Sequence, residues 1–192
     1  MDMLATSVLA FWFGEPGSPG HGKPRVEWFR KDPAFDEAIR RRFGDAVAIA
    51  LAGGYGAWCV SPEGALARIL LLDQFTRNIY RGTPRAFAGD ARALATAEDA
   101  IARGFDLALT PNERRFVYMP FEHAEDEAVQ HRSLELFAAL SKALGDDDPL
   151  VWARKHAEVI FRFGRYPHRN AILGRASTPD EEAYLREPGA GF

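Results

Sequence analysis

The chain repeats one local signal for the start of a helix, an Asp or a Thr followed directly by Pro. Four such pairs precede predicted helices: Asp32-Pro33, Thr110-Pro111, Asp148-Pro149 and Thr178-Pro179. An Asp or Thr at the N-cap accepts hydrogen bonds from unpaired backbone N–H groups, and the Pro that follows needs no donor of its own. After Thr110 and Thr178, a Glu three residues later completes a capping box. These signals predict a chain of separate helices.

Apolar residues at helical spacing fill most of the intervals between these starts. Residues 14–24 hold four Gly and three Pro and are predicted to form a loop. Pro120 must kink or break its helix, because it has no amide donor. No stretch alternates with a period of two, so no sheet is expected. We expect helices over residues 3–13, 33–52, 63–80, 90–103, from 111, 124–144, 149–163 and from 179.

The fold class that follows is all-α. Short loops between consecutive helices imply antiparallel helical hairpins, arranged as a bundle or as a superhelix of about seven to ten helices. Such a superhelix would be like that of tetratricopeptide-repeat (TPR) proteins, although their consensus is absent. The 192 residues suit a single domain over 1–192.

Composition excludes several function classes. A hydrophobic content of 47% excludes a disordered chain, and a net charge of −3 gives no general attraction to nucleic acid or to an anionic membrane. Cys59 is the single cysteine, so no intramolecular disulfide and no cysteine zinc site is expected. The apolar N-terminal run is too short to span a bilayer and lacks a basic flank. We expect a cytoplasmic protein without a cofactor.

A first polar cluster lies inside the most apolar predicted helix. Asp73 shares a helical face with Leu70, and Arg77 lies one turn further on. Gln74 and Asn78 repeat that spacing one position later. A charge among apolar residues is costly unless it is paired or used. The cluster is therefore either a buried ion pair that braces the fold or the polar wall of a ligand site.

A second cluster gathers basic and amide side chains near the C-terminus. Its members are Arg162, Arg165, His168, Arg169, Asn170 and Arg175. Gly164 and Pro167 mark a turn after which a short helix can start, and amides at a helix start favour an anion. Arginine forks bind phosphate or carboxylate in bidentate fashion. Alternatively, these arginines hold the C-terminal helix by its acidic residues Asp180, Glu181 and Glu182.

A third group lies at the end of the helix that Pro120 interrupts. Glu122 or His123 is a candidate general acid or base, because an apolar environment shifts the pKa of such groups. His123, Glu127 and His131 recur every four residues and would share a face of a continuous helix. The outer two would be about 12 Å apart, so we assign no metal site.

Four segments, in this order, resemble the bacterial DUF924 family, a family of unknown function. They are residues 28–29, 71–78, 118–123 and 163–170. The resemblance implies an all-helical, TPR-like fold and no particular reaction. Thr76 departs from the pattern, since the family commonly has proline there. The resemblance implies ten signature positions: Asp73, Gln74, Arg77, Asn78, Glu122, His123, Arg165, His168, Arg169 and Asn170.

Our leading hypothesis is that the three clusters meet at one pocket that binds a small anionic molecule. Glu122 and His123 would then be an acid and a base if the ligand is turned over, and the other eight signature residues would contact the ligand. A rival hypothesis is an interaction scaffold, whose helical groove holds a peptide or a second copy of the chain and whose clusters are braces. A third, weaker hypothesis is a metal-assisted hydrolase.

Overall fold

The structure is a computed structural model that describes residues 2–191, and every regular element in this range is helical. The all-α prediction is therefore confirmed. The chain forms two compact units. Unit 1 takes residues 1–81 and 85–120, and unit 2 takes residues 82–84 and 121–192. Pro120 is the last residue of unit 1, but α6 continues through it to Glu122, so the helix does not break there.

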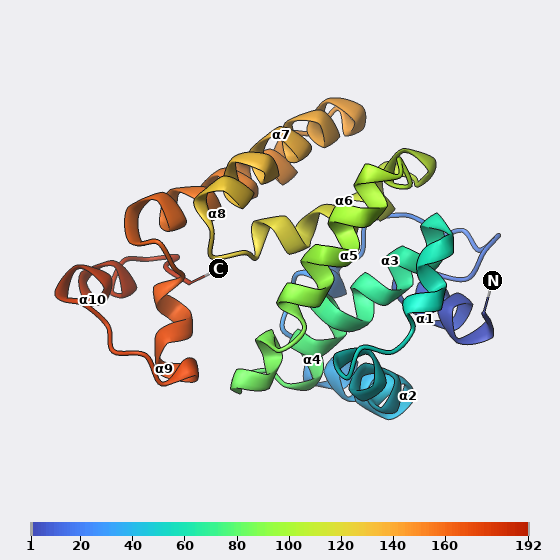
Figure 1. Cartoon of the computed structure of the whole chain (residues 1–192), viewed down its shortest axis with the longest axis horizontal. Coiled ribbons are helices and arrows are strands. Elements are labelled where there is room, and N and C mark those ends of the chain that lie inside the picture. The colour runs from blue at the N-terminus through green and yellow to red at the C-terminus, as the bar shows by residue number, and fades with distance from the viewer. Residues whose placement is uncertain (1, 192) are drawn as a thin grey trace. The chain divides into compact units, whose positions relative to one another are not determined.

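The helices agree closely with the intervals predicted from caps and spacing (Figure 1). Unit 1 contains α1 (Met3–Phe13), α2 (Pro33–Leu51), α3 (Pro62–Leu70), α4 (Thr76–Ile79), α5 (Asp90–Ala102) and most of α6 (Pro111–Glu122). Unit 2 contains α7 (Glu127–Leu144), α8 (Asp148–Phe163), α9 (Asn170–Leu173) and α10 (Pro179–Leu185).

Three of the four predicted helix starts, at Asp32, Thr110 and Thr178, have the expected capping bonds. At the fourth, Asp148 is the first residue of α8 and the N-cap Asp147 makes no side-chain capping bond. Asp32 accepts hydrogen bonds from the N–H groups of Ala34 and Phe35. Thr178 and Glu181 form a complete capping box at the start of α10. These bonds satisfy backbone donors that the first helical turn leaves unpaired, so the helix starts are set locally.

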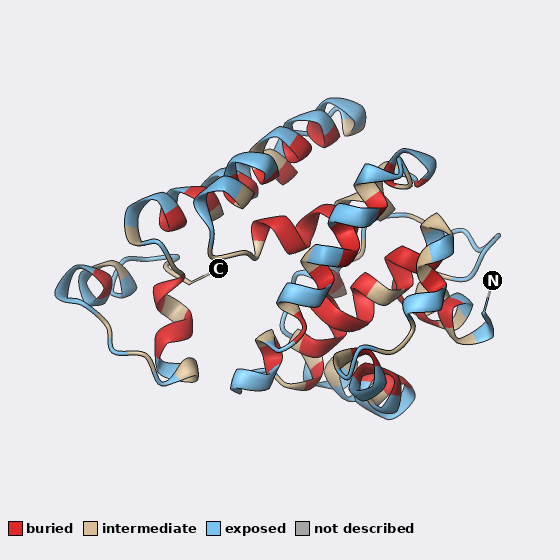
Figure 2. Ribbon diagram, viewed as in Figure 1, coloured by how far each residue is buried: buried red, intermediate tan, exposed pale blue. Residues whose placement is uncertain are grey.

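A continuous helical run from α3 to α4 lies at the centre of unit 1, and α1, α2 and α5 pack against parts of it. Buried residues line this run (Figure 2). Its middle segment, Leu71–Phe75, is a π-helix, a wider turn that is often found at functional sites. The Thr76 hydroxyl donates to the Leu71 carbonyl over 2.8 Å, so threonine supplies the donor for a carbonyl in this wider turn. The helix continues through Thr76 without a break.

Unit 2 is built on the hairpin of α7 and α8, which lie side by side (Figure 1). Gly145 ends α7 in the left-handed conformation that glycine adopts most readily, and α8 begins three residues later. Val159, Ile160 and Tyr166 form a small core on which Phe163 and Tyr184 pack. Within the described range, no helix is long and apolar enough to cross a membrane.

Candidate functional site

The first polar cluster forms an ion-pair network inside unit 1. Asp73 is fully buried, and Nη1 of Arg77 lies 2.9 Å from its Oδ1. The same guanidinium binds both carboxylate oxygens of Asp90, at 2.9 and 3.1 Å. Gln74 donates to the other oxygen of Asp73 over 2.5 Å. Arg77 thus joins the π-helical segment to the first turn of α5, which is the bracing arrangement that we considered for this pair.

Asn78 also binds another part of unit 1. Its amide donates to Oδ1 of Asp36 over 2.6 Å, and Arg81 binds both oxygens of the same carboxylate, at 2.9 and 3.0 Å. Because Asp36 belongs to α2, this group joins α2 to the end of α4. The hydrogen bonds of Asn78 and Arg81 therefore stabilise the packing of two helices.

Arg165 holds the C-terminal helix of unit 2. Its guanidinium binds both carboxylate oxygens of Glu181, at 2.6 and 2.8 Å, and donates to the carbonyl of Ala176. The hydrogen bonds from Arg165, together with the N–H of Thr178, lower the pKa of Glu181 to about 2. Asn170 donates to the same carboxylate and to Ser177. Our alternative, that arginines hold the C-terminal helix, thus describes Arg165.

Arg175 fixes the turn between α6 and α7. It binds both carboxylate oxygens of Glu125, at 2.6 and 2.9 Å, and donates to the Tyr166 carbonyl. The Tyr166 N–H donates to the same carboxylate over 2.7 Å. Burial raises the pKa of Glu125, but the bonds from Arg175 and Tyr166 outweigh it and hold the pKa below its ordinary value. This turn is thereby joined to the segment that follows α8.

Five residues of unit 2 gather around one fully buried ring, that of Tyr166. The His156 and His168 rings lie 5.8 and 5.5 Å from it, and the Arg169 guanidinium lies 4.6 Å above it. The Tyr166 hydroxyl donates to the Glu122 carbonyl, and Arg169 donates to the His123 carbonyl over 3.0 Å. We call this group the histidine cluster: Glu122, His123, His156, Tyr166, His168 and Arg169.

The cluster contains one imidazole whose pKa is strongly lowered and one buried cation. Burial, then the positive charge of Arg169, lower the pKa of His168 to about 4. His168 is therefore neutral at pH 7, where its nitrogens can donate and accept hydrogen bonds without a charge. Arg169 is 6% exposed and stays charged at any ordinary pH. Arg169 thus gives the cluster a permanent positive charge beside a neutral His168 ring.

The structure brings together four of the ten signature residues, namely Glu122, His123, His168 and Arg169. It adds His156 and Tyr166, which were not among the predicted site residues. His156 follows Trp152 on an apolar stripe that is typical of a core position, and no local spacing connects it with Glu122. Only the packing of α8 in unit 2 places them side by side. That all three polar segments meet at one pocket stays a prediction.

The structure does not place His123, Glu127 and His131 on one helical face, which was the reason for considering a metal site. α6 ends at Glu122 and α7 begins at Glu127, so His123 does not lie on the helix of Glu127 and His131. The helix predicted over 124–144 thus begins three residues later than expected, at Glu127. The His131 ring instead packs against the Phe161 ring, with centroids 4.8 Å apart and planes tilted by 31°. Among residues 2–191, no group of three or more His, Cys, Asp or Glu side chains is placed to hold a metal ion.

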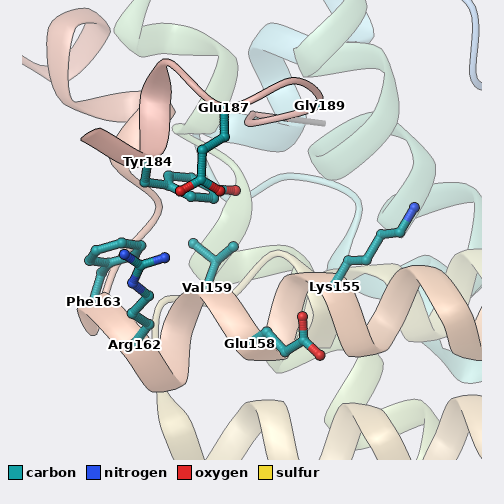
Figure 3. A pocket seen from close by; sticks show the side chains of 8 residues that line it. All are labelled: Lys155, Glu158, Val159, Arg162, Phe163, Tyr184, Glu187 and Gly189. Carbon is teal, nitrogen blue, oxygen red and sulfur yellow. The ribbon is translucent and has the colours of Figure 1, made fainter. Parts of the chain in front are cut away.

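Unit 2 also has a hollow of about 290 Å³ between α8 and the residues that follow α10 (Figure 3). Val159, Phe163 and Tyr184 give it an apolar lining. Four charged residues and a glycine complete the lining: Lys155, Glu158, Arg162, Glu187 and Gly189. This hollow is lined by two positive and two negative side chains, so it has no net charge to attract an anion. It contains none of the ten signature residues.

Comparison with known proteins adds a family and one solved structure. The family described as "Bacterial protein of unknown function (DUF924)" matches residues 8–189. A solved structure of a protein of unknown function, ATU0120 from Agrobacterium tumefaciens, is 42% identical in sequence. The match covers 96% of this chain and 98% of that chain, with a TM-score of 0.83. No curated protein matches the chain.

Proposed function

We propose that the histidine cluster of this chain, which belongs to the DUF924 family of unknown function, binds a small anionic molecule. The observation that supports this proposal is the buried guanidinium of Arg169 beside three partly exposed imidazoles. A cation held next to hydrogen-bonding rings attracts an anion and offers it directional partners. The proposal narrows our sequence-based hypothesis to one unit of the chain.

Each of the two carboxylates near Arg169 also has another partner of its own. Glu125 is bound on both oxygens by Arg175, and Glu122 pairs with His156. The Arg169 guanidinium donates to the neutral carbonyl of His123. We therefore propose that Arg169 supplies charge and that His123 and His168 supply hydrogen bonds.

We further propose that the remaining signature residues act at a distance from the ligand. They are Asp73, Gln74, Arg77, Asn78, Arg165 and Asn170. Their described hydrogen bonds go to other protein groups, and a side chain already held in this way has fewer donors to offer a ligand. Their role would be to keep the helices of each unit in place.

A thermal-shift screen with inorganic phosphate, citrate and adenosine monophosphate tests the proposal. An anion at 100 times its dissociation constant stabilises the folded state by about 2.7 kcal/mol. At about 2–4 °C per kcal/mol for a chain of this size, this corresponds to roughly 5–10 °C. The shift should be lost in Arg169→Gln and retained in Arg132→Gln, a matched control in an exposed ion pair with Glu135.

Two results would overturn the proposal. One is the absence of a shift with any of the three anions. The other is an equal shift in Arg169→Gln and in the natural protein. His168→Asn provides a second variant that leaves the guanidinium in place, and it should weaken the shift without abolishing it.

The interaction scaffold remains our second candidate function, and exposed apolar residues on α8 favour it. Val151, Trp152 and Phe161 are 42%, 38% and 40% exposed. TPR-like stacking of helical hairpins would present such a face to a peptide or to a second copy of the chain. Light scattering over a range of protein concentrations tests self-association. A mass that rises with concentration and falls back in Phe161→Ser would support the scaffold, and a constant monomer mass would exclude self-association.

A further inference from the structure

The histidine cluster contains a carboxylate–imidazole pair. Glu122 is the last residue of α6, and its Oε1 lies 3.0 Å from Nδ1 of His156 on α8. Glu122 is 4% exposed, and the imidazole is the one side chain that pairs with its carboxylate among residues 2–191. A buried carboxylate is costly unless it is paired and hydrogen-bonded, so this geometry holds the imidazole firmly in place.

A second contact fixes which nitrogen of His156 holds the hydrogen. Nδ1 also lies 2.9 Å from the carbonyl oxygen of Trp152. A carbonyl and a carboxylate only accept hydrogen bonds, so Nδ1 must be the donor to both. In the neutral ring the lone pair then lies on Nε2. The two acceptors therefore select the tautomer in which Nε2 is the basic nitrogen.

We infer that His156 is the proton acceptor of the histidine cluster and that Glu122 is its positioning residue. This inference rests on the proposed function, because it names the chemistry of the same site. Nε2 forms a bond to the proton as an O–H bond of the ligand breaks. The imidazole gains one positive charge and the ligand one negative charge. Glu122, on the opposite side of the ring, stabilises the positive charge.

The surroundings of His156 suit such a role. The His123 ring lies 6.3 Å away and the Tyr166 ring 5.8 Å away. The His156 side chain is 13% exposed, so a small molecule can reach it, whereas that of Glu122 is 5% exposed. The ligand class that fits is an anion that also has a hydroxyl group, with its charge toward Arg169 and its hydroxyl toward His156.

Nitrogen NMR of the natural protein, without ligand, tests the tautomer directly. Long-range proton–nitrogen spectra distinguish a ring with hydrogen on Nδ1 from one with hydrogen on Nε2. The His156 signals, assigned by their loss in His156→Gln, should show the Nδ1–H form. His131, which is exposed on α7, is an internal control and should show the Nε2–H form that is ordinary for histidine. An Nε2–H form at His156 would overturn the inference.

Chemical modification tests the part played by Glu122. Diethyl pyrocarbonate acylates the basic nitrogen of neutral histidine, and mass spectrometry of peptides follows each ring separately. In Glu122→Gln, acylation of His156 should be roughly threefold slower, because a charge-assisted hydrogen bond becomes a neutral one. Glu125→Gln is a matched control in the same turn, where the carboxylate binds Arg175, and it should leave the rate unchanged. Equal rates in Glu122→Gln and the natural protein would overturn the inference.

These outcomes separate the inference from the proposed function. Both measurements are made without a ligand, so a failed anion screen does not alter them. An Nδ1–H form with slower acylation in Glu122→Gln supports the pair even where no tested anion binds. A shift with phosphate together with an Nε2–H form at His156 would refute the inference alone.

Discussion

A single methyl group at Gly89 should destabilise the protein strongly. Gly89 is the N-cap of α5, and a Cβ built there would lie 2.0 Å from the carbonyl oxygen of Leu72 and 2.8 Å from its carbonyl carbon. Both are backbone atoms of the buried π-helical segment, so no side-chain rotation relieves the clash. To restore an ordinary 3.4 Å contact, the two backbones must separate by about 1.4 Å. We expect Gly89→Ala to lower the free energy of unfolding by about 3 kcal/mol, the upper part of the range for overpacking.

Gly44→Ala is a matched control with the opposite sign. Gly44 lies inside α2, where an added Cβ meets no atom within 4 Å. Alanine loses less conformational freedom than glycine on folding, so this variant should be stabilised by about 0.5–1 kcal/mol. Urea unfolding followed by circular dichroism measures both. A Gly89→Ala protein within 1 kcal/mol of the natural one would refute the close approach of α5 to Leu72.

Three further perturbations test the braces and the cluster. Arg77→Met removes the arginine beside the buried Asp73 and should lower the free energy of unfolding, measured with urea, by about 3–5 kcal/mol. A loss below about 1 kcal/mol would mean that the pair does not brace the fold. The folded pKa of His168, about 4, lies below the ordinary 6.5, so the unfolded state takes up a proton first as pH falls. Stability should fall by up to about 2–3 kcal/mol between pH 6.5 and 4, and His168→Asn should remove that part of the slope in a pH series of urea midpoints. Thr178→Ala removes the capping box of α10 and should cost about 1 kcal/mol, and no change in its midpoint would show that the cap does not contribute.

The helices could be predicted because their starts depend on neighbouring residues. Asp32 caps the N–H groups of the two residues after Pro33, and Thr178 and Glu181 bind each other's backbone across three residues. Such contacts need no tertiary structure. The buried pair of Asp73 and Arg77 is likewise one helical turn apart, so spacing alone indicated it.

Features that depend on distant residues could not be predicted. The π-helical turn at Leu71–Phe75 hardly changes the spacing of apolar residues along the sequence. The apolar pattern therefore predicts an ordinary α-helix there. An arginine that holds a ligand and one that holds a helix have the same sequence signature, and only the position of Glu181 shows which kind Arg165 is. The pairing of Glu122 with His156 also exists only after α8 has packed in unit 2.

The most direct test of anion binding by the histidine cluster is an NMR titration of the histidine side chains with inorganic phosphate. The chain has five histidines, of which His123, His156 and His168 belong to the cluster, while His21 and His131 do not. The proposal predicts saturable shifts of the three cluster signals, no comparable shift of the other two, and loss of the effect in Arg169→Gln. No shift, or a similar shift of all five signals, would contradict it.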